Sequence, residues 1–260
     1  LNQSQLEQEL KGTDIVFHLA AILDEDDPQL FEVNVHGTKN ILEASSKAHV
    51  KQFVFLSSVG VMGDVQEIAD ENTPLNPKTR YEQSKAQAEQ AVLSYQEVLP
   101  ITIIRSALVL GANKYWKKII EMITENKPLI GDGENKWQIV YSGDLVDALI
   151  FLAGKDEALG ETFIVAEKEP KKLIEIVEFI RKEKKVEGEL KKMPVWLAKI
   201  SATIYSFVSK ITGKKTFFTG EIIDRLTRER IYSTKKIESL GWQAKIDTFS
   251  ALEKTMEEIK

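Results

Sequence analysis

The sequence predicts an α/β fold, a doubly wound parallel sheet with a small, mostly helical lobe towards the C-terminal end. Four stretches are apolar over about five consecutive residues, which is typical of strands buried on both faces of a parallel sheet. Stretches with apolar residues at helical spacing lie between them, and strands that alternate with helices indicate βαβ units. With 260 residues, the chain is long enough for a substantial core.

The elements are expected in a regular order as far as Gly111. A short helix at 4–10 carries Leu6 and Leu10 on one face and ends before Gly12. Buried strands and amphipathic helices then alternate, at 14–21, 31–48, 52–56, 80–98 and 101–105. After Gly111 the pattern loosens, with elements expected at 116–126, 138–141, 144–153, 162–166 and 171–184 and mostly helical segments from Pro194 onward.

The composition excludes several classes of function. The chain has no Cys, which excludes disulfides and thiolate metal sites, and its three His residues share no motif, so we expect no metal. Its 35 basic and 40 acidic residues give a net charge of -5, which gives no reason to expect a nucleic acid partner. The sequence starts at Leu1 without a signal-peptide pattern, and the composition fits a reducing compartment, so we expect a cytoplasmic protein.

Ser58, Tyr81 and Lys85 are the most informative polar residues. Ser58 follows a buried strand, at the carboxyl end where open α/β sheets bind ligands. Tyr81 and Lys85 are four residues apart on an expected helix, so their side chains share one face. A nearby ammonium lowers the pKa of a phenol from its ordinary value of about 10, and a Ser hydroxyl can bond a substrate oxygen. These residue types suit hydride transfer at a carbinol carbon beside a nicotinamide.

The spacing between Tyr and Lys occurs a second time, at Tyr232 and Lys236. Ser209 lies 23 residues before Tyr232, as Ser58 does before Tyr81. Ser209, however, falls in an amphipathic helical stretch, whereas Ser58 follows a buried strand. Spacing and context alone leave both a catalytic and a plain surface interpretation open for the first set.

Six short motifs extend over almost the whole chain. They are His18-Leu19-Ala20-Ala21, Asn34-Val35-His36-Gly37-Thr38, the run from Ser57 to Gly63, Tyr81-Glu82-Gln83-Ser84-Lys85, the run from Arg105 to Gly111, and Leu240-Gly241-Trp242. In this order they resemble the extended short-chain dehydrogenase/reductase family, of the NAD-dependent epimerase/dehydratase type. Ser106 and Leu110 depart from the family pattern, which has Pro and Tyr there.

The resemblance implies a Rossmann-like fold, NAD or NADP as cofactor, a small-molecule substrate and a homodimer as one assembly. It implies that Tyr81 is the acid/base, that Lys85 lowers its pKa and orients the ribose, and that Ser58 polarises the substrate oxygen. The residues that it places against the cofactor are Leu19, Ala20, Ala21, Tyr81, Lys85 and Ser106. Residues 1–111 would then be a partial NAD(P)-binding domain, joined by the strand at 162–166, with 112–161 and 167–260 mainly substrate lobe and capping helices.

The family's glycine turn is missing from this sequence. Gly60 and Gly63 are three apart, but no third Gly follows at position 66. In the family, a Gly-x-x-Gly-x-x-Gly turn holds the cofactor's pyrophosphate with backbone amides and a helix N-terminus. We therefore expect an N-terminally truncated sheet that lacks roughly 60 residues, an estimate from typical βαβ lengths. Such a chain alone would bind NAD(P) poorly and be inactive.

The expected substrate follows from a second departure. Family members that act on nucleotide-linked sugars carry Arg-Asp-Phe after a Gly-Asp-Gly turn, but here Lys136 and Trp137 follow that turn. The missing Arg tilts the prediction towards the branch resembling 3β-hydroxysteroid dehydrogenases and dihydroflavonol reductases, with an apolar secondary alcohol or ketone as substrate. A nucleotide-sugar epimerase or dehydratase is the alternative, and a non-catalytic scaffold protein is a third possibility.

The stretch from Pro194 to Ile211 carries one apolar stripe. Its members are Trp196, Ile200, Ile204, Phe207, Val208 and Ile211. We interpret it first as a helix that caps the substrate lobe, with a lid or a membrane-surface helix as alternatives. Lys199 and three Ser interrupt it, so we expect no membrane span but allow peripheral membrane contact.

Overall fold

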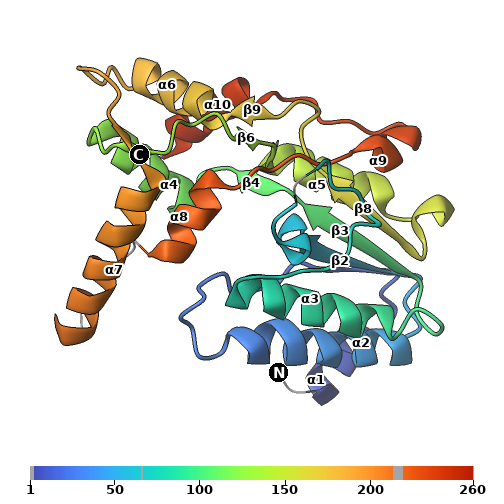
Figure 1. The fold of residues 1–260 in the computed structure, drawn as a ribbon. Helices are drawn as coiled ribbons and strands as arrows, with labels where there is room; N and C mark the ends of the chain where they lie inside the picture. Colours follow the sequence, from blue (N-terminus) through green and yellow to red (C-terminus); the bar gives the residue numbers. More distant parts are fainter. Residues whose placement is uncertain (1–2, 66, 213–218, 260) are drawn as a thin grey trace. The chain divides into compact units, whose positions relative to one another are not determined.

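A computed structural model describes residues 3–65, 67–212 and 219–259, with the backbone alone for 207–211 (Figure 1). The chain forms two compact units. The first contains the residues up to Val109 together with Val140–Lys168 and Tyr232–Lys245, and the second contains the remainder. The segment 140–161, expected in the substrate lobe, therefore packs with the first unit. The roles of the units as cofactor and substrate parts stay predictions.

A four-stranded parallel sheet forms the centre of the first unit. Its strands are β1 (Ile15–His18), β2 (Gln52–Ser58), β3 (Ile101–Ser106) and β8 (Glu161–Val165), in the order β1-β2-β3-β8. Each neighbouring pair is parallel, with helices in the connections. The predicted fold class, an α/β fold with a Rossmann-like parallel sheet, is confirmed.

Helices cover both faces of this sheet (Figure 1). The helical segments of the first unit are α1 (Gln3–Glu9), η1 (Glu32–Gly37), α2 (Thr38–Lys47), η2 (Val59–Met62), α3 (Arg80–Leu93), α5 (Ser142–Leu152), η3 (Asp156–Ala158) and α9 (Lys235–Ser239). Successive side chains of β2 alternate between the faces, so Phe53 and Phe55 pack with α2 and α3 while Val54 packs with α5. This alternation explains why the strand sequence is apolar throughout.

The first strand differs from its expected form. It ends at His18 rather than at residue 21, and Phe17 is 41% exposed, so it is not buried on both faces. The physical reason is its position, because β1 lies at the edge of the described sheet and pairs there with β2. Leu19, Ala20 and Ala21 follow it as irregular chain.

The second unit combines helices with very short strands. Its elements are α4 (Lys114–Thr124), β5 (Leu129–Ile130), β6 (Lys136–Trp137), β9 (Lys171–Lys172), α6 (Leu173–Glu183), β10 (Lys192–Met193), α7 (Val195–Thr212), α8 (Gly220–Thr227) and α10 (Thr248–Glu258). Strand β5 pairs with β10 and β6 with β9, while β4 (Leu108–Leu110) pairs with β7 (Ile139–Tyr141). An apolar pocket lies in this unit, lined by residues of α4, α6 and α8 and by the buried Trp137.

Candidate active site

The predicted site residues lie at one edge of the sheet. Ser58 ends β2, and its in-register partner Ser106 ends β3, where the Ser106 hydroxyl donates to the Ser57 carbonyl at 3.4 Å. Leu19 and the two residues after it follow the end of β1, which pairs in register with β2. Because parallel strands share one carboxyl edge, these groups gather where such sheets bind ligands.

Lys85 reaches the same edge from α3. This helix begins with a capping box between Thr79 and Glu82, which fixes where its first turn starts. The Lys85 Nζ donates to the Leu56 carbonyl at 2.7 Å and lies 4.2 Å from the centre of the Phe55 ring. Burial lowers the pKa of Lys85 to about 8, while the Glu89 carboxylate opposes this shift. The ammonium is therefore held at the end of β2, two residues before Ser58.

Tyr81 stands one turn before Lys85 in the first turn of α3 and is half-buried. Its backbone carbonyl accepts a hydrogen bond from the Ser84 hydroxyl at 2.7 Å, and that hydroxyl accepts one from the Asn34 amide at 2.9 Å. The same Asn34 side chain accepts from the Ile22 N–H at 2.7 Å and donates to the Ile22 carbonyl at 2.9 Å. Asn34 thus ties the loop after β1 to the helix of Tyr81, a role that the sequence pattern did not indicate.

Ser58 begins a tight turn against α3. Its hydroxyl accepts from the Gly60 N–H at 3.1 Å, which caps η2. A Cβ at Gly60 would stand 3.0 Å from the Glu82 Cγ, so a residue without a side chain allows this close approach. The turn that begins at Ser58 therefore packs directly against the first turn of α3.

His18 has a structural place beside this site. Its Nε2 lies 2.8 Å from the Thr38 hydroxyl, which itself donates to the Asn34 carbonyl at 2.6 Å. Because that hydroxyl has one proton, His18 Nε2 is the donor. Burial, and secondarily the charge of Lys85, lower the pKa of His18 to about 4, so the ring is neutral at pH 7.

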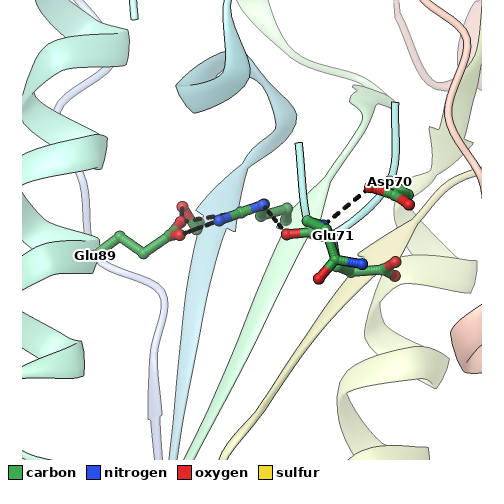
Figure 2. A network of polar contacts seen from close by, with 6 residues as sticks. Asp70, Glu71 and Glu89 are labelled. Carbon is green, nitrogen blue, oxygen red and sulfur yellow. Dashed lines mark hydrogen bonds and ion pairs between the residues drawn. The ribbon is translucent and has the colours of Figure 1, made fainter. Parts of the chain in front are cut away.

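A buried ion pair lies behind Ser58. The Arg105 guanidinium donates to Glu89 at 2.5 Å, and Ser57 donates to the same carboxylate at 2.7 Å. On its other side the guanidinium bonds the Glu71 carbonyl at 3.0 Å, and the Glu71 carboxylate accepts from the Ile164 N–H at 2.9 Å. Figure 2 shows Glu89 and Glu71 on either side of this guanidinium. The network connects β2, β3, β8 and α3, and it adjoins the predicted site because Ser57 precedes Ser58 in β2.

Lys236, the lysine of the second pair with this spacing, lies away from Ser58. Lys236 donates to Glu161 at 2.6 Å, and Glu161 is the first residue of β8. Lys236 therefore lies where the parallel strands begin, whereas Ser58 lies where they end. The side chain of Ser209 lies outside the described residues.

Arg230 is a cation of the second unit that the sequence pattern did not single out. Its N–H donates to the Lys136 carbonyl at 2.8 Å, and its guanidinium lies 4.5 Å from the centre of the Trp137 ring. The guanidinium also donates to the Arg225 carbonyl at 2.8 Å. A guanidinium therefore stands beside the segment where the expected Arg is missing, supplied from 94 positions later in the chain (230 - 136 = 94).

Comparison with known families bears on these residues. The model of the "NAD dependent epimerase/dehydratase family" matches residues 1–166, which is more than half of the chain. The chain belongs to this family. The resemblance stated from the motifs is confirmed, and of the two cofactors expected, NAD and NADP, the family's description names NAD.

Three relatives illustrate the range of the family. An epimerase of Escherichia coli O157:H7, named N-acetyl-alpha-D-glucosaminyl-diphospho-ditrans,octacis-undecaprenol 4-epimerase, is 28% identical over 98% of this chain and 80% of its own length. A decarboxylating sterol-4-alpha-carboxylate 3-dehydrogenase of Candida albicans is 27% identical over 94% of this chain and 76% of its own. The fold matches a dTDP-glucose 4,6-dehydratase of Streptomyces venezuelae, solved with NAD, at a TM-score of 0.76 and 20% identity over 98% of this chain and 76% of that one. The epimerase relative and a dTDP-D-glucose 4,6-dehydratase of Mus musculus, 28% identical over 96% of this chain and 68% of its own, favour the nucleotide-sugar epimerase or dehydratase over the main expectation from the sequence, an oxidoreductase for an apolar alcohol.

Lys85 makes the stability of the fold depend on pH. The folded chain loses the Lys85 proton near pH 8, whereas an unfolded lysine keeps it to about 10.5. Between these values the unfolded state binds more protons, so the Lys85 contribution to the free energy of unfolding rises with pH. Chemical denaturation from pH 7 to pH 10 measures this free energy. The difference in free energy of unfolding between Lys85→Met and the parent should therefore favour the variant most near pH 7 and become smaller as pH rises. The exposed Lys39→Met of α2 is the control, and parallel curves for Lys85→Met and the parent would contradict the expectation.

Proposed function

We propose that the protein is an NAD-dependent epimerase or dehydratase that acts on the sugar of a sugar diphosphate. The observation that carries this proposal is the placement of Lys85 on the Leu56 carbonyl, which brings its ammonium to the strand end of Ser58 and to the helix turn of Tyr81. Family membership and the activities named for the epimerase and dehydratase relatives support it.

In this proposal each residue of the set has one role. Tyr81 takes the proton from a sugar hydroxyl and later returns it, because a phenol near an ammonium is a competent base. Lys85 supplies that positive charge and a hydrogen-bond donor, since its Nζ has three hydrogens and the Leu56 carbonyl uses one. Ser58 donates to the sugar oxygen from the turn that it caps.

The described residues fit one end of the cofactor. Leu19 is 48% exposed and Ala20 is exposed, so the chain after β1 is accessible at the carboxyl edge of the sheet that Lys85 also reaches. NAD, when bound, would accept the hydride from the carbon that bears this sugar hydroxyl. The sequence holds no glycine turn for the pyrophosphate, and we assign that contact to no residue of this chain.

In the second unit, considered by itself, Arg230 is a cation suited to phosphate oxygens. A guanidinium offers bidentate hydrogen bonds to phosphate oxygens, which the neighbouring Lys136 cannot. The contact with the Trp137 ring holds the Arg230 guanidinium at β6, the strand that follows the Gly131–Gly133 turn in the sequence. Arg230 therefore offers, within the second unit, a guanidinium beside the segment where the expected Arg is missing.

A redox-neutral reaction tests the proposal. Epimerisation and dehydration both remove and return a hydride, so UDP- or dTDP-sugars should be converted, as followed by NMR, without net reduction of NAD. The same assay should be run with a sugar linked to undecaprenyl diphosphate. One similar protein is named for a substrate of that kind, and another for a sugar linked to a nucleoside diphosphate. Stoichiometric reduction of NAD by a sterol or another apolar alcohol, without sugar conversion, would instead support the oxidoreductase alternative. Two observations favour that alternative, namely the apolar pocket of the second unit and the sterol dehydrogenase relative.

A further inference from the structure

Over its described side chains, helix α7 buries two alanines and exposes Trp196, Ile200 and Ile204. Ala198 and Ala202 are buried against Ile130 and Ile223 of the second unit. On the other side, Trp196 is 65% exposed, Ile200 51% and Ile204 59%. At about 100° per residue these three span one sector roughly opposite the two alanines. The stripe expected to cap the lobe thus faces outward over its described part, because alanines let α7 approach its neighbours more closely than isoleucines would.

This arrangement inverts the pattern of an ordinary surface helix, whose outward face is polar. Leu197, 39% exposed, adjoins the same sector and widens the patch. Contiguous apolar patches of this kind mark surfaces that meet another apolar phase or partner. Among the described residues, no helix is long and apolar enough to cross a membrane. An apolar face of this size on a helix of 18 residues is suited to lie in a membrane surface.

The charge around α7 indicates what covers it. The segments 191–212 and 219–230, which contain β10, α7 and α8, have seven basic and three acidic residues, a net charge of +4 (7 - 3). The whole chain has a net charge of -5, so positive charge is concentrated here. Anionic lipid headgroups attract such segments, whereas a two-fold dimer would place this basic surface against its own copy.

We propose that the face formed by Trp196, Leu197, Ile200 and Ile204 docks the protein on the surface of an anionic phospholipid bilayer. The apolar side chains enter the boundary between headgroups and acyl chains, and the basic residues of the flanking segments other than Arg230 contact the headgroups. This property is independent of the reaction proposed above.

Intrinsic fluorescence offers a specific test. Of the four Trp residues, Trp116, Trp137 and Trp242 are buried and Trp196 is exposed, so a change in emission on docking reports on α7. Phosphatidylcholine vesicles that contain phosphatidylglycerol should sediment the protein and shift its emission to the blue. Vesicles of phosphatidylcholine alone should bind at least tenfold more weakly, and added salt should weaken binding to the anionic ones. In Trp196→Phe the emission shift should disappear.

Matched variants separate docking from folding. Ile200→Ser with Ile204→Ser should lower vesicle binding at least tenfold, whereas Val146→Ser with Ile150→Ser, equally exposed on α5, should leave it unchanged. Circular dichroism and thermal unfolding check that both pairs fold, as exposed positions should allow. Equal vesicle binding by both pairs overturns the proposal. A second outcome also overturns it. If light scattering without lipid shows a dimer, and the Ile200 and Ile204 changes dissociate it while the α5 changes do not, the face joins two copies of the chain.

Discussion

Replacing Tyr81 by Phe should lower the turnover of the protein by about 10²- to 10⁴-fold, the usual contribution of a positioned acid/base. The change removes one hydroxyl and leaves the aromatic ring. The contacts that hold this turn of α3 use the Tyr81 backbone carbonyl through Ser84 and Asn34, and they stay intact. The loss should therefore appear in kcat, with the affinity for NAD nearly unchanged in calorimetry.

Tyr232→Phe is the matched control for this experiment. Tyr232 has the same spacing to a Lys, but Lys236 pairs with Glu161 at the amino end of β8. Turnover of the control should stay close to that of the parent. Retained turnover in Tyr81→Phe, or an equal loss in both variants, would remove Tyr81 from the proposed mechanism.

Replacing Arg105 by Leu should destabilise the fold by about 3–5 kcal/mol, the usual cost of leaving a buried charge without its partner. The Glu89 side chain is fully buried, and after the change the Ser57 hydroxyl is left as its remaining described partner. The Glu71 carbonyl loses its guanidinium donor as well, so the chain around Glu71 is released from β3. Chemical denaturation at pH 7 measures the loss.

Two comparisons make this prediction specific to the ion pair. Combining Arg105→Leu with Glu89→Leu removes both charges and should recover much of the loss, because an apolar pair of similar volume carries no desolvation cost. Lys118→Ala breaks an exposed pair with Glu121 and should cost about 0–1 kcal/mol. The prediction fails if Arg105→Leu costs no more than Lys118→Ala, or if the double variant is less stable than Arg105→Leu.

Much of the first unit could be predicted because its signals are local. Runs such as Phe53-Val54-Phe55 are apolar at every position, and only strands covered on both faces need this pattern. The edge position of β1 was missed, because the exposure of Phe17 depends on which strands stand beside it. The placement of Ser58 also followed from order alone, since a residue after a buried parallel strand lies at the carboxyl edge.

The contacts around the site could not be predicted in the same way. Asn34 and Ser84 are 50 residues apart, and periodicity compares only near neighbours. Arg230 was missed for the same reason, since no pattern within one segment relates it to Trp137. The direction of α7 was also undetermined, because its sequence offers both an alanine face and an isoleucine face for burial.

The sequence by itself determined the α/β class, the family and the position of Ser58, Tyr81 and Lys85 relative to strand and helix, because these follow from local periodicity and motif order. Only the tertiary structure decided that Lys85 bonds the end of β2, that Asn34 ties the β1 loop to α3, and that α7 presents its large side chains outward. The physical reason is that a hydrogen bond or a buried face needs a partner. In a doubly wound sheet that partner usually comes from a distant part of the chain.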